Sequence, residues 1–249
     1  MPLTLLMTRR SALLALGSAI GGAFVVACAA PASSGPDAAT PGTDGPTGDG
    51  TPGACATTAD ETAGPYPDTK NMVGTPGTYR SDVREDRTGV PLTVTLKIVD
   101  AANGCAAIAG AHVEIWHCDA SGVYSEYANA MNAGSTAATY LRGVQTTDAA
   151  GNVTFTTIYP GWYQGRATHI HIQVYNGTAA RKTTQLAFPE ATNQAVYGGA
   201  APDYKKGQNS TTNASDMVFG DGDATELATV TGSVAAGYAA ALQIGVTGY

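Results

Sequence analysis

The chain has 249 residues, of which 43% are hydrophobic and only 13% are charged, and its formal net charge is −7. This length suits one globular domain with some additional unstructured chain better than two full domains. The acidic charge argues against nucleic acid and anionic membrane surfaces as binding partners, because both repel a negatively charged protein. The many glycines and threonines, together with little helical periodicity, favour an all-β class.

Residues 1–28 have the organisation of an export signal. Arg9 and Arg10 precede an uncharged apolar run that is too short and too rich in Gly and Ala for a transmembrane span. The stretch "TRRSAL" is similar to a twin-arginine signal, although the usual Phe and Lys are absent. The stretch "VVAC" resembles a lipobox, in which Cys28 would carry a lipid and attach the protein to a membrane; an ordinary cleaved signal is the alternative. We therefore expect an exported protein, in the cell envelope or outside the cell.

Residues 29–53 have no apolar periodicity and are rich in Pro, Gly, Ser and Thr, which predicts a disordered linker. The ordered domain is then expected over residues 54–249. It contains Cys55, Cys105 and Cys118, and an oxidising compartment favours one disulfide and one remaining thiol. All three pairings are open; the turn position of Cys105 and the position of Cys55 at the start of the domain favour that pair.

The domain sequence contains short runs with strand character, separated by turn signals. Residues 91–100 show the alternation of a half-buried strand, with apolar side chains at every second position. Short strands at such spacing, without an amphipathic helix between them, favour an antiparallel β-sandwich. Residues 189–223 are strand-poor and are expected to form loops, some of them folded over a site. The other predicted strands are 111–119, 152–158, 168–175 and 183–188, with two strand-like pieces in 226–246.

The strand predicted at 168–175 carries two histidines on one face. Strand side chains alternate between faces, so the isoleucines and Val174 form a core face while His169 and His171 point the other way. The two imidazoles are then about 6–7 Å apart along the strand. Both can reach one ion, and neutral imidazole is the most common metal ligand. The pair alone is a weak signal, because surface histidines often alternate with core residues.

Two tyrosines accompany this strand. Tyr163 lies in the tight turn "PGWY" just upstream, and Tyr124 follows a strand-ending turn. With these residues the chain resembles the intradiol ring-cleavage dioxygenases, which include catechol and protocatechuate dioxygenases. The resemblance covers roughly residues 55–190 and is densest from 142 to 174. The matching stretches are "ETAGPYP", "RSDVREDRTGVPLTVTLKIVD", "GAHVEIWHCDASGVYS", "YLRGVQTTDAAGNVTFTTIYPGWYQGRATHIHIQV" and "TTQLAF".

The resemblance implies a transthyretin-like (prealbumin-like) sandwich that holds a mononuclear non-haem Fe(III). The four protein ligands would be Tyr124, Tyr163, His169 and His171. This donor set is chemically coherent, because phenolate oxygen is a hard anionic donor that suits ferric iron. A bound trivalent cation would also strongly favour the ionised phenolate over the phenol.

The implied reaction uses O2 to open a catechol-type ring between its two hydroxyls, giving a muconate-type diacid. Arg166 would stabilise negative charge that develops on the substrate, Tyr124 would act as a base when released from the metal, and Gln185 matches the family's active-site glutamine. The expected partners are a small aromatic diol and O2, and the sequence does not predict an oligomeric state. Further substrate contacts are expected from Tyr66, Trp162 and Gln164, whereas His112 and His117 match no ligand position.

Two other readings of the sequence remain open at this stage. A transthyretin-like sandwich on the cell surface could bind a metal or an aromatic ligand without catalysis. A surface adhesion or structural module is the second alternative, and an iron-free, colourless protein would favour it. Each candidate residue also has a structural reading, since tyrosines in a sheet, an Arg paired with a carboxylate and a Gln on an edge strand are all common.

Overall fold

A computed structural model describes residues 55–249 of the chain. The expected export signal, the lipobox at Cys28 and the linker at 29–53 lie outside the described residues. Within residues 55–249, no helix combines the length and the apolar character needed to cross a membrane.

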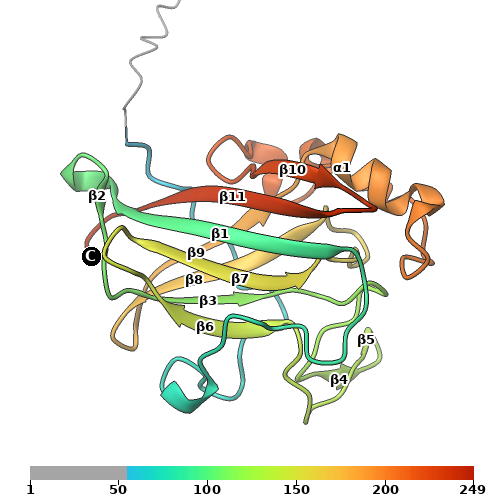
Figure 1. The fold of residues 1–249 in the computed structure, drawn as a ribbon, viewed down its shortest axis with the longest axis horizontal. Helices are drawn as coiled ribbons and strands as arrows, with labels where there is room; N and C mark the ends of the chain where they lie inside the picture. The colour runs from blue at the N-terminus through green and yellow to red at the C-terminus, as the bar shows by residue number, and fades with distance from the viewer. Residues whose placement is uncertain (1–54) are drawn as a thin grey trace, which may run out of the picture. The chain divides into compact units, whose positions relative to one another are not determined.

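The described residues fold around two packed β-sheets (Figure 1). In the first sheet, β1 (Pro91–Asp100) lies at the centre, with β11 (Gly237–Val246) along one side and β7 (Asn152–Ile158) and β2 (Ala106–Ala107) along the other. Strand β10 (Thr229–Ser233) pairs with β11 at the edge. All pairs are antiparallel except β1 and β11, which run parallel. The predicted all-β sandwich is confirmed, and this parallel pair is the departure from purely antiparallel pairing.

The second sheet has the strand order β6-β3-β8-β9 and is antiparallel throughout. A small separate hairpin follows β3 in the chain, and the remaining elements are short helical turns. Figure 1 shows α1 and the small hairpin at the same end of the strands. The bounds are β3 (His112–Trp116), β6 (Arg142–Thr146), β8 (His169–Asn176), β9 (Ala179–Ala187), the hairpin β4 (Ala128–Asn129) and β5 (Asn132–Ala133), the 3-10 turns η1 (Pro76–Thr78), η2 (Ala101–Asn103), η4 (Asn213–Ser215) and η5 (Phe219–Asp221), α1 (Glu190–Ala195) and the π-helical turn η3 (Val196–Ala200).

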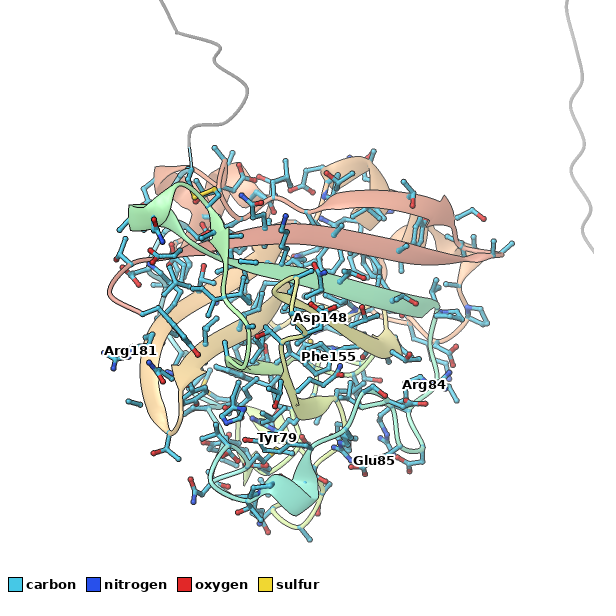
Figure 2. All side chains as sticks on the ribbon, turned by 60° about the vertical axis from the view of Figure 1, so that its left-hand side comes forward. Tyr79, Arg84, Glu85, Asp148, Phe155 and Arg181 are labelled. Atoms are coloured by element: carbon cyan, nitrogen blue, oxygen red, sulfur yellow. A yellow bond between two sulfur atoms is a disulfide. The ribbon has the colours of Figure 1, made fainter. Side chains whose placement is uncertain are left out.

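The core lies between the two sheets. Alternate residues of β1 are buried, as their period of two predicts, and they pack with the core face of β8 that contains Ile170, Ile172 and Val174. Phe155 of β7 is fully buried among them, whereas Arg181 points away from the sheets in Figure 2. His117 is also buried here, and its ring nitrogens bond the Cys118 carbonyl and the Thr157 hydroxyl.

The outer face of the second sheet is also covered, so β3 and β8 are buried on both faces. The N-terminal segment 58–66 crosses this face, held by backbone hydrogen bonds from Thr58 to Gly245 and from Glu61 to Thr183. A disulfide between Cys55 and Cys105 fixes the start of this segment, so the favoured pairing is confirmed. Cys118 is free and buried. The polar face of β8 is therefore enclosed rather than exposed to solvent.

Several element predictions need correction. Strand β6 was missed because its sequence, "RGVQT", lacks clear apolar alternation, and the two-residue strands β2, β4 and β5 are too short to leave a pattern. Strand β9 begins four residues earlier than predicted, at Ala179. Residues 189–223 contain no strand, as expected, but they form α1 and several turns, and Tyr197, Tyr204 and Phe219 within them are buried.

Candidate active site

A row of side chains crosses the outer face of the second sheet. The strand registers place Trp116 of β3 opposite His171 of β8, with Arg142 of β6 beyond Trp116 and Gln185 of β9 beyond His171. Directly paired residues point to the same face of a sheet. The indole of Trp116 stacks on the His171 ring, with centroids 4.8 Å apart and an interplanar angle of 3°. This stacking fixes the plane of the His171 imidazole.

The two histidines of β8 direct the same ring nitrogen toward a common point. The Nε2 atoms of His169 and His171 lie 3.1 Å apart. Nδ1 of His169 is 2.7 Å from the Ala167 carbonyl oxygen, which can only accept, so Nδ1 carries the proton and the lone pair is on Nε2. Burial lowers the pKa of His169 to about 3, and it lowers the pKa of His171 well below its usual value. Both imidazoles are therefore neutral donors.

Two phenols lie beside these nitrogens. The hydroxyl of Tyr124 is 3.2 Å from Nε2 of His169, and the Tyr124 and Tyr163 rings have centroids 6.0 Å apart. The Tyr163 hydroxyl forms a 2.9 Å hydrogen bond with the hydroxyl of Tyr66. Burial raises the pKa of Tyr124 well above its usual value, so its phenol stays neutral unless a cation is nearby. The four residues predicted as metal ligands are thus brought together from three stretches of the chain.

The predicted arginine is held rigidly at the edge of the same site. Nε of Arg166 donates to Oδ2 of Asp216 at 2.9 Å, and Nη2 donates to Oε1 of Gln185 at 2.7 Å. The amide of Gln185 in turn donates to the carbonyl of Thr62 at 2.8 Å. Gln185 therefore links Arg166 to the N-terminal segment 58–66 that covers the sheet. In this position it orients the Arg166 guanidinium.

A cavity of about 760 Å³ is lined by the two tyrosines, the two histidines and Arg166. Of the three residues expected to contact substrate, Tyr66 and Gln164 line it. Trp162 does not: its indole N–H donates to the carbonyl of Gly207 at 2.8 Å, and Lys206 lies over its ring. The other lining residues are Thr62, Gly64, Pro65, Tyr124, Tyr127, Asn129, Met131, Tyr163, Gly165, Arg166, His169, His171, Met217 and Val218.

Three buried polar residues that support the site were not found from the sequence. The Asn132 side chain forms hydrogen bonds with both backbone groups of Tyr124. Its Oδ1 accepts from the Tyr124 amide at 2.7 Å, and its Nδ2 donates to the Tyr124 carbonyl at 2.9 Å. Arg142 donates to the carbonyls of Tyr66 and Ser125 and so joins two of the segments around the cavity. Asp216, which anchors Arg166, is the third. Asn132 and Asp216 belong to no recognisable motif, whereas Arg142 lies in a stretch that matches the family but was given no role there.

The comparison with protein families gives a match over the same region. The family model described as "Dioxygenase" matches residues 70–196, which is about half of the chain. The chain belongs to the intradiol ring-cleavage dioxygenase family. As a member of this family it is an enzyme, an intradiol ring-cleavage dioxygenase. The non-enzymatic carrier and the adhesion module receive no support from this membership.

Solved structures of intradiol dioxygenases share the fold. An intradiol ring-cleavage dioxygenase from Tetranychus urticae is 28% identical, with a TM-score of 0.68 over 78% of this chain and 95% of that chain. The dioxygenase domain of a dioxygenase carbohydrate-binding protein fusion from a cellulolytic Streptomyces is 25% identical, with a TM-score of 0.55 over 77% and 99% of the two chains. A 3-chlorocatechol 1,2-dioxygenase from Rhodococcus opacus, at 19% identity and a TM-score of 0.52, covers 78% of this chain and 75% of its own and shows the fold alone.

The donor groups in the cavity fit a metal ion. Among residues 55–249, no three His, Cys, Asp or Glu side chains gather as a metal site, so a metal at this position would depend on the phenols to complete its ligand set. Nε2 of His169, which carries the lone pair, lies 3.1 Å from Nε2 of His171 and 3.2 Å from the Tyr124 hydroxyl. Gly64, with φ at +68°, lets the covering segment approach His171, and a Cβ there would lie 3.0 Å from the ring. Phenolate and imidazole donors together suit ferric iron.

Proposed function

We propose that this dioxygenase uses one Fe(III), held by Tyr124, Tyr163, His169 and His171, to open a catechol-type ring between its two hydroxyls. The proposal is supported chiefly by the convergence of two neutral imidazole nitrogens, 3.1 Å apart, with a buried phenol hydroxyl. The bond that breaks joins the two hydroxyl-bearing carbons. Both atoms of O2 end in the muconate-type diacid, so no external reductant is needed.

The residues around the cavity have separate tasks in this proposal. When bound, the iron would supply Lewis-acid chemistry that activates the diol ring toward O2. The Tyr124 phenolate would take a proton from a substrate hydroxyl, since its oxygen lies at the cavity wall beside His169. Arg166 would place a fixed positive charge where the ring becomes electron-rich, and its bonds to Asp216 and Gln185 keep that charge in place before substrate arrives.

The test is metal analysis with a visible spectrum of the purified protein, followed by oxygen-electrode assays with catechol. We expect about one iron per chain and a purple-to-red band from tyrosinate-to-iron charge transfer. His169→Ala should lose both iron and the band. His112→Ala is the matched control, because His112 lies outside the cavity and bonds only the Thr146 hydroxyl through its ring. A wild-type protein that takes up no iron and gives no oxygen uptake with any diol would end the proposal.

We also propose that the enzyme acts outside the cytoplasm. The proposal is supported by the signal-like residues 1–28 and by the Cys55–Cys105 disulfide, because disulfides persist mainly in oxidising compartments. Fractionation of cells that express the full chain tests this, with Cys28→Ser separating lipid attachment from simple export. Full-length protein found only in the cytosol would contradict the proposal.

A further inference from the structure

Two exposed methionines stand at the cavity. Three large hydrophobic side chains of the described residues are exposed, and two of them, Met131 at 77% and Met217 at 86%, line this one cavity. They come from segments 86 residues apart in the sequence. The third, Leu227 at 41%, lies elsewhere, beside the η4 and η5 turns. Exposed apolar side chains that gather at one place indicate a surface that a ligand covers.

Hydrogen bonds hold the Met131 backbone and the residues on either side of Met217, although both methionine side chains are exposed. The amide of Met131 donates to Oδ1 of Asn129 at 2.9 Å, within the turn of the β4–β5 hairpin. Met217 lies between Asp216 and Val218, and the Val218 amide donates to Oδ1 of Asp216 at 2.7 Å. The methionines are therefore held at the cavity, while their flexible thioether chains can adapt to differently shaped ligands.

The cavity is larger than a single-ring diol needs. One water molecule occupies roughly 30 Å³ in the liquid, which we take as an upper limit for the volume of each heavy atom of a ligand. Catechol has eight heavy atoms and therefore needs at most about 240 Å³. The cavity volume is about 760 Å³. With the ring diol beside the histidines, space remains for a substituent against the other lining residues, which include Tyr127, Pro65 and the two methionines.

The charge of the lining limits what can fill that space. Arg166 is the one charged side chain among the lining residues of the described chain, and Asp216 and Gln185 already engage it. Among the described residues no second cation lines the cavity, so a carboxylate placed against the methionine side chains would lose part of its hydration without gaining an ion pair. A substituent at this end should therefore be uncharged.

We infer that the preferred substrates are catechol-type diols with an uncharged apolar or aromatic substituent that lies between Met131 and Met217. This inference rests on the proposed ring cleavage and narrows its substrate class. A single apolar contact of this kind changes specificity by about 10- to 200-fold. We therefore expect kcat/KM for 4-phenylcatechol to exceed that for protocatechuate, which carries a carboxylate at the same ring position, by at least about tenfold.

The experiment measures oxygen uptake with catechol, 4-phenylcatechol and protocatechuate, and anaerobic calorimetry gives the dissociation constant of each. Met217→Ser and Met131→Ser should each weaken binding of 4-phenylcatechol by about three- to tenfold relative to catechol. Leu227→Ser is the matched control, since it removes a comparable exposed side chain outside the cavity, and it should leave the ratio unchanged.

The outcomes separate the two proposals. If catechol is cleaved but protocatechuate is bound and cleaved as well as or better than 4-phenylcatechol, the inference is wrong and the ring-cleavage proposal stands. If both methionine variants keep the wild-type ratio, the preference does not come from this surface and the inference is likewise overturned. If no diol is bound or cleaved by iron-loaded protein, both proposals fail together.

Discussion

Asp216 offers the sharpest test of how the site is built. Its carboxylate is buried and accepts hydrogen bonds from Nε of Arg166 and from the backbone amides of Ala167, Val218 and Phe219. Burial opposes its charge, but the bonds from Ala167, Arg166 and Val218 outweigh burial and hold the pKa of Asp216 below its usual value. The side chain therefore stays ionised and positions Arg166 without lining the cavity itself.

Asp216→Asn removes this charge with little change in shape. Asparagine keeps one acceptor oxygen, but its NH2 group would face donors that now bond the other oxygen, and Arg166 would lose the charge that pairs with it while keeping its 2.7 Å bond to Gln185. Removing one partner of a buried ion pair destabilises a protein by about 3–5 kcal/mol. A fixed donor for developing negative charge is worth about 10²- to 10³-fold in kcat. Because Gln185 still restrains the guanidinium, we expect kcat on catechol to fall by a smaller factor, roughly 10- to 100-fold.

A double-mutant cycle separates positioning from general destabilisation. Oxygen uptake is measured at a temperature where every variant is folded, for Arg166→Leu, Asp216→Asn and the double variant. If Asp216 acts through Arg166, the double variant should be no slower than Arg166→Leu alone, because the anchored group is already absent. The visible band and iron content should match the wild type in all three, since none of these residues is a proposed ligand. Losses in kcat that multiply in the double variant would refute the reasoning.

Two further predictions concern stability. Replacing Cys55 and Cys105 with serine should lower the free energy of unfolding by about 4 kcal/mol, because the disulfide closes a loop with a sequence separation of 50, and chemical denaturation would measure the loss. Burial raises the pKa of Glu114 to about 7, from 4.5, against a hydrogen bond from Tyr175. The stability that this carboxyl contributes is complete below about pH 4.5 and is lost as the pH rises through 7. The Tm of Glu114→Gln should therefore fall less between about pH 5 and pH 8 than the Tm of the wild type. Equal falls in Tm for the two proteins would contradict the raised pKa of Glu114.

The sequence predicted the parts of the site that follow a simple period. His169 and His171 share a face because strand side chains alternate, and the isoleucines that alternate with them identify the core side without any structure. Tyr124 and Tyr163 lie on loops, where no period applies. They were found only through the resemblance to a family. Side chains on loops are positioned by individual contacts, such as the two hydrogen bonds between the Asn132 side chain and the Tyr124 backbone.

The contacts that no pattern revealed connect distant parts of the chain. Asp216 meets Arg166 across 50 residues, through a loop whose path is fixed by backbone amides bonding that same carboxylate. The parallel pairing of β11 with β1 joins the last strand to the first, and local alternation predicts a strand but not its partner. Strand β6 was missed because Arg142 and Gln145 make it look like a loop, although Arg142 is fully buried.

The disulfide and the covering segment together have a mechanical consequence. Residues 62–66 form one wall of the cavity, where Gly64 lies against the His171 ring and Tyr66 bonds the Tyr163 hydroxyl. The disulfide gives a pull on the chain upstream of Cys55 a second path, through Cys105 to the turn beside β1. Because the bridge shares the load with the backbone, a force on the amino end should disturb the wall less than it would in a Cys55→Ser, Cys105→Ser variant.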